Sequence, residues 1–75
     1  MLLAIDMAAL IKSIAEGIHC GLVRDGWLPA DLAACQRPSE TADAMRWRFA
    51  LERARNIAAY IKAESDLAAE LVEAA

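Results

Sequence analysis

The sequence predicts an all-α protein of two long antiparallel helices, at about residues 2–24 and 39–73, joined by a short helical linker. Three observations predict this fold. Apolar residues recur at helical spacing in both long segments. Alanine, the strongest helix former, supplies 18 of the 75 residues. Two prolines, Pro29 and Pro38, fall between the segments. Because a chain of this length forms one domain, residues 1–75 are predicted to be a single helical domain.

The first helix is predicted from a broad apolar face and a well-formed stop signal. Arg24 lies in the last turn, where a cation suits the carbonyl end of the helix dipole, and Gly26 suits the left-handed conformation that ends a helix. Gly17 and Gly21 are four residues apart, a spacing that predicts the close approach of another helix. The apolar face consists of Leu3, Met7, Leu10, Ile11, Ile14, Ile18 and Leu22.

The linker is predicted to contain one or two helical turns. Trp27 follows the stop signal in the position from which its indole ring can fold back over Leu22. Pro29 suits the first position of a short helix that residues 30–35 continue. Pro38 then disfavours helical geometry in the residue before it and ends the linker. A connection of this length lets the two main helices pack antiparallel.

The second helix is predicted to begin after a cap at Ser39 and to carry two apolar stripes. The main stripe is expected to pack against the first helix, so that Ile57 and Ile61, together with Ile14 of the first helix, are buried. The main stripe consists of Trp47, Ala50, Ala54, Ile57, Ile61, Ala68 and Val72. The second stripe consists of Met45, Phe49, Tyr60, Ala63 and Leu67.

The second stripe predicts a homodimer, because one neighbouring helix covers only one stripe. The distribution of charge along the second helix also favours a homodimer. The first part of the helix carries four arginines against three acids, and the last part carries one lysine against four acids. Two antiparallel copies would therefore oppose charges of opposite sign and form a four-helix bundle. The predicted dimer interface comprises Met45, Phe49, Tyr60 and Leu67.

Little in the sequence predicts chemistry at a catalytic or metal site. His19 and Cys20 are adjacent on a helix and point about 100° apart, and no spacing supplies a fourth ligand beside Cys35. The chain is therefore predicted to be no enzyme and to hold no metal or cofactor. With no export signal or membrane-spanning run, it is expected to be cytoplasmic, with both cysteines reduced.

The four arginines at residues 46–55 are the clearest indication of a binding function in the sequence. Arginines beside aromatic rings can grip nucleic acid, but a net charge of −3 and the placement of both rings on apolar stripes argue against it. The same residue types anchor protein interfaces. The predicted partner-binding residues are Arg46, Arg48, Phe49, Arg53 and Tyr60.

The sequence thus predicts a small protein–protein interaction module. It would act as an adaptor, or as an inhibitor that occludes a surface of a larger partner, as the small inhibitors that phages or plasmids direct against host complexes do. Two alternatives stay open. One is a DNA-associated transcriptional regulator that uses the arginine segment, and the other is an accessory subunit of an enzyme complex.

Overall fold

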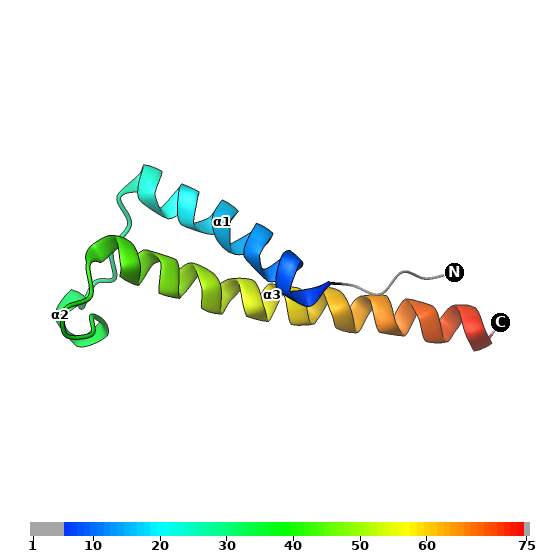
Figure 1. The fold of residues 1–75 in the computed structure, drawn as a ribbon. Coiled ribbons are helices and arrows are strands. Elements are labelled where there is room, and N and C mark those ends of the chain that lie inside the picture. The colour runs from blue at the N-terminus through cyan, green and yellow to red at the C-terminus, as the bar shows by residue number, and fades with distance from the viewer. Residues whose placement is uncertain (1–5, 75) are drawn as a thin grey trace.

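The computed structural model describes residues 6–74. Within them the chain forms helix α1 (Met7–Asp25), the single-turn helix α2 (Leu32–Cys35) and the long helix α3 (Ala42–Ala74). Helices α1 and α3 pack side by side as an antiparallel hairpin, and α2 lies in the linker at its closed end (Figure 1). The predicted all-α hairpin is confirmed, while the predicted residues 2–5 of the first helix, Leu3 among them, lie outside the described residues.

Both ends of α1 are capped by local hydrogen bonds. The Asp6 carboxylate accepts a hydrogen bond from the backbone N–H of Ala9 at 3.1 Å. At the other end Gly26 has a φ of 64°. The N–H groups of Gly26 and Trp27 then donate to the carbonyls of Val23 and Leu22, at 3.1 and 3.0 Å. These paired bonds satisfy carbonyls that the helix leaves free. The predicted stop signal is confirmed, and the helix extends one residue further, to Asp25.

The starts of α2 and α3 differ from the prediction because other residues supply the caps. The Asp31 carboxylate accepts from the N–H of Ala34 at 3.3 Å, so α2 begins after Asp31 and not at Pro29. Thr41 Oγ1 accepts from the N–H of Ala44 at 3.1 Å and caps α3. Ser39 cannot cap this helix, because its φ of 65° lies far from the extended conformation that a cap residue adopts.

A row of alanines forms the centre of the contact between the two long helices. Ala50, Ala54 and Ala58 are spaced four residues apart on α3 and are fully buried, as is Ala15 on α1. Because an alanine side chain is one methyl group, the two backbones approach closely here. The prediction that Ile57 and Ile61 are buried was wrong: they are 36% and 38% exposed.

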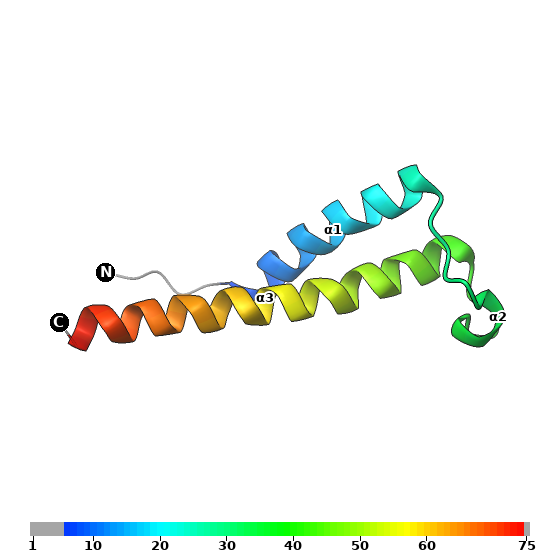
Figure 2. The ribbon, with the colours of Figure 1, turned by 180° about the vertical axis from the view of Figure 1, so that it is seen from behind.

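Two further predictions about packing are corrected. Met45 is fully buried, although the prediction placed it at a dimer interface. At about 3.6 residues per turn it lies on the opposite side of α3 from Ala54, near the end of the helix beside which the linker lies (Figure 2). Gly17 and Gly21 make no close approach within the hairpin, because a β-carbon built on either meets nothing within 4 Å in the described structure. Ile14 is half-buried.

A bidentate ion pair holds the linker against the start of α3. The Arg48 guanidinium donates to both carboxylate oxygens of Glu40, at 2.9 and 3.0 Å, and to the carbonyl of Cys35 at 2.6 Å. The Glu40 carboxylate also accepts from the N–H of Arg37 at 3.0 Å, and the Gln36 amide donates to the Glu40 carbonyl. The hydrogen bond from Arg48, followed by that from Arg37, lowers the pKa of Glu40 from 4.5 to about 2.

We expect Ala54→Leu to destabilise the protein more than the same change at Ala59, which is exposed on the same helix. A larger side chain at Ala54 forces the two helices apart, and overpacking of this kind costs about 1–3 kcal/mol. Denaturant unfolding at one fixed protein concentration measures the difference. Equal stability of the two variants would contradict a close contact along the alanine row.

We also expect Glu40→Gln to remove part of the acid sensitivity of the protein. Since folding lowers the pKa of Glu40 from 4.5 to about 2, the ionised carboxylate stabilises the fold above pH 4.5, and this contribution is lost as the pH falls through about 2. The variant should therefore unfold more readily than wild type at pH 6 and equally readily near pH 2. Glu52→Gln is the control, because Glu52 is exposed on α3 and forms no ion pair within the described residues. A stability gap that stayed constant with pH would argue against the ion pair.

Candidate interaction surface

The last part of α3 exposes several large apolar side chains. In this distal segment, residues 60–73, Tyr60 is 68% exposed, Leu67 50%, Leu71 65% and Val72 73%. Figures 1 and 2 show the reason, since α3 runs well past the described start of α1. Single exposed apolar residues are ordinary, but a succession of them along one helix indicates a surface that binds another protein.

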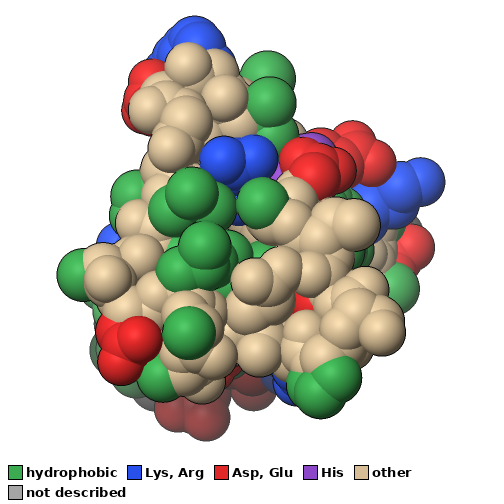
Figure 3. Space-filling view, turned by 90° about the vertical axis from the view of Figure 1, so that its left-hand side faces the viewer, with side chains coloured by type: hydrophobic (Ala, Val, Ile, Leu, Met, Phe, Trp, Pro, Cys, Tyr) green, Lys and Arg blue, Asp and Glu red, His purple; other side chains and the backbone are tan. Residues whose placement is uncertain are grey.

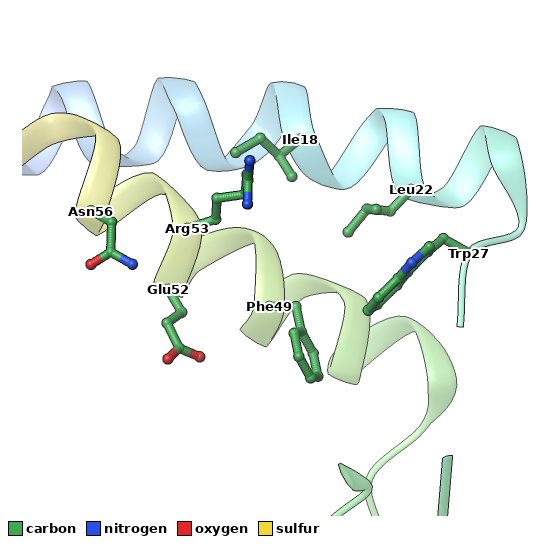
Figure 4. Close-up of a pocket in the computed structure, with 7 residues that line it drawn as sticks. All are labelled: Ile18, Leu22, Trp27, Phe49, Glu52, Arg53 and Asn56. Carbon is green, nitrogen blue, oxygen red and sulfur yellow. The ribbon is translucent and has the colours of Figure 1, made fainter. Parts of the chain in front are cut away.

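A groove between α1 and α3 lies beside the linker end of the hairpin. Its volume is about 480 Å³. Figure 4 shows the Trp27 indole between Leu22 and Phe49, with the two aromatic rings edge to face at a centroid distance of 5.3 Å. The Arg53 side chain points toward α1 near Ile18, whereas Glu52 points away from α1. The groove therefore has apolar walls and a cation directed into it. Its lining consists of Ile18, Leu22, Trp27, Phe49, Glu52, Arg53 and Asn56.

The groove and the distal segment share one side of α3. At about 100° per residue, Phe49, Arg53 and Asn56 of the groove point in nearly the same direction as Tyr60 and Leu67. This side is the second apolar stripe of the sequence without Met45. The groove adds a wall from α1 and the linker, and the interaction surface is therefore continuous along α3 from residue 49 to residue 71.

The closed end of the hairpin offers a less uniform surface. Figure 3 views the molecule from that end and shows separate apolar patches, divided by exposed backbone and by charged side chains of both signs. Leu28, at 40% exposed, lies in the linker at this end. The side of α3, in contrast, aligns its apolar residues in one direction, and it is the better candidate for a binding surface.

The structure divides the predicted arginine cluster. Arg48 binds Glu40 within the chain and also lies over the Phe49 ring at 5.2 Å, and its role in binding a partner stays a prediction. The Nε of Arg46 donates to the carbonyl of Trp27 at 2.7 Å. Arg53 and Arg55 are exposed and form no ion pair within residues 6–74. Arg46, Arg53 and Arg55 thus have no acidic partner within the described residues, and a role on DNA stays a prediction.

The other polar side chains of interest belong to local pairs. His19 lies 3.0 Å from the Asp43 carboxylate and edge-on to the Trp47 ring, with centroids 5.4 Å apart. In the part of the chain that the structure describes, His, Cys, Asp and Glu side chains form no group of three or more that could hold a metal ion. In the distal segment Lys62 pairs with Asp66 at 2.7 Å, as helical spacing predicts. The remaining acids there carry their charges into solvent.

Sequence reasoning missed most of the groove. Phe49 and Arg53 were predicted as partner-binding residues and they do line it, whereas Ile18 and Leu22 were assigned only to the apolar face of the first helix. Trp27 was expected to cover Leu22 as a lid, and it forms a wall beside it. The signal that could have located the groove is the stop motif at Gly26, because it fixes where the chain carries this indole ring.

None of the helices described between residues 6 and 74 is long and apolar enough to cross a membrane.

In comparisons with known proteins, no family model matches the chain, and no curated protein and no solved structure is significantly similar to it.

Proposed function

We propose that the protein is a non-enzymatic protein–protein interaction module that acts as a homodimer. The observation that carries the proposal is the distal segment of α3, in which Tyr60, Leu67 and Leu71 share one side of the helix and are each at least half exposed. An isolated chain would leave this apolar surface in water. A second copy that covers it recovers roughly 25 cal/mol for each Å² of apolar area removed from water.

The shape of the chain supports the same proposal. Its radius of gyration is 16.4 Å, and it measures 53 × 20 × 19 Å. A compact domain of this length has a radius of gyration of about 11 Å. Among the residues that the structure describes, the five fully buried side chains are four alanines and one methionine, so the hydrophobic core formed by them is small. Small domains with little core commonly gain stability by oligomerisation.

The charges of α3 favour an antiparallel pair of copies. Between residues 42 and 56 the helix carries four arginines and two acids, and one of those arginines is bound to Glu40 in the linker. The distal segment carries one lysine and four acids. Antiparallel copies would set the basic part of each α3 against the acidic part of the other, and such complementarity selects orientation more than it adds affinity.

The dimer would serve as an adaptor, or as an inhibitor that occludes a surface of a larger protein. Exposed Arg55 lies away from the groove side of α3 and stays available to that protein in the proposed dimer. An acidic surface is its natural complement. Affinity capture with wild-type protein and with Arg55→Glu, which leaves the proposed self-association surface intact, would test this step. Equal capture of the same partner by both proteins would show that Arg55 does not contribute to binding that partner.

We expect light scattering to return twice the chain mass of 8.1 kDa at micromolar concentration. Leu67→Asp should raise the dissociation constant of the dimer strongly, since burying an unpaired charge costs several kcal/mol and every 1.4 kcal/mol is about tenfold in affinity. Ser65→Asp adds the same charge at an exposed position on another side of α3 and should leave the dimer intact. A monomer mass for wild type at high micromolar concentration would refute the proposal.

A further inference from the structure

The groove and the distal segment are complementary in chemistry and in position. The groove offers apolar walls from Leu22, Trp27 and Phe49, with the Arg53 cation directed into it. The distal segment offers exposed leucines at Leu67 and Leu71, one helical turn apart, in an acidic stretch of the chain. We propose that the groove of each chain receives the distal segment of α3 from a second copy. This inference rests on the proposed dimer and specifies its geometry.

The spacing along α3 sets the register of this pairing. The groove occupies residues 49–56 of α3, and the two leucines follow at residues 67 and 71. An antiparallel pairing with its two-fold axis close to Ile61 and Lys62 brings Leu67 of one copy over Asn56 of the other. The same register brings Leu71 beside Arg53 and sets Tyr60 against Ala63. Because the axis is two-fold, both grooves are filled at once and the pairing closes at two copies.

The groove side of α3 is also free of the intramolecular packing. The alanine row that faces α1 lies at Ala50, Ala54 and Ala58, and helical geometry places Phe49, Asn56 and Tyr60 well round the helix from it. A second α3 can therefore lie along α3 without displacing α1. It would also contact the α1 wall of the groove at Leu22, which completes a bundle of four long helices. Glu52 points away from α1 and lies at the outer margin of this contact, so it does not obstruct the seat of the leucines.

Disulfide cross-linking between introduced cysteines tests the register. The full chain is first made free of its native thiols by Cys20→Ser and Cys35→Ser, and light scattering checks the mass of this background. Asn56→Cys and Leu67→Cys are then combined in one chain. Eleven residues of straight helix separate the two positions by about 16 Å, whereas a disulfide requires Cα atoms within about 7 Å. The pair can therefore close only between copies.

Three controls fix the interpretation. Each single variant, Asn56→Cys or Leu67→Cys, would cross-link to itself in a parallel dimer and should stay uncross-linked in the proposed antiparallel one. Arg55→Cys combined with Leu67→Cys moves one thiol by a single residue to another side of α3, and it should cross-link poorly. After mild oxidation, cross-linked dimer should be the main product of the Asn56→Cys, Leu67→Cys chain alone on a non-reducing gel.

The outcomes separate this inference from the proposed function. A dimer mass with cross-linking confined to the Asn56→Cys, Leu67→Cys chain supports both. A dimer mass without that cross-link, or with cross-linking in a single variant or in the Arg55→Cys control, overturns the groove as the seat of the distal segment and leaves the dimer standing. A monomer mass for wild type and for the cysteine-free background overturns both.

Discussion

The close contact between α1 and the alanine row of α3 is the constraint on which the rest of the structure depends. Ala50, Ala54 and Ala58 bring the helices together with very little side-chain volume between them. Larger residues therefore lie at the margins of the contact, as Ile57 does, which is 36% exposed. The same margin on the groove side is where Phe49 and Trp27 meet. A thicker core would have hidden these side chains, and the hairpin would then have offered less surface for binding.

The linker at the closed end of the hairpin supplies one wall of the groove between α1 and α3. The ion pair between Arg48 and Glu40 holds the linker against the start of α3, and the bond from Arg46 to the Trp27 carbonyl fixes where the chain leaves α1. Two of the four arginines that look functional in the sequence thus act inside the molecule. Charge-assisted, bidentate hydrogen bonds of this kind have strict geometry, and they position the wall of the groove that the linker supplies.

The sequence predicts the hairpin well because the signals are local. The helical periodicity, the stop at Gly26 and the two prolines each act over a few residues, and the observed helices follow them closely. The errors arise where the outcome depends on contacts distant in sequence. Ser39 looks like a cap, but Glu40 is drawn to Arg48 and the turn moves the cap to Thr41. Met45 falls on an outward stripe by periodicity, yet it is fully buried.

The unequal lengths of the two helices have a consequence for local stability. The first half of α3 packs against α1, and the linker also contacts it at residues 46–49. Residues 60–73 are supported along the helix mainly by their own backbone hydrogen bonds. Helical ends without tertiary packing open readily. Amide hydrogen exchange in one isolated chain would therefore follow a gradient along a single unbroken helix, slow at the alanine row and fast toward Ala74. Any molecule that covers the distal segment would flatten that gradient, and its binding would be coupled to the ordering of the last four turns of the helix.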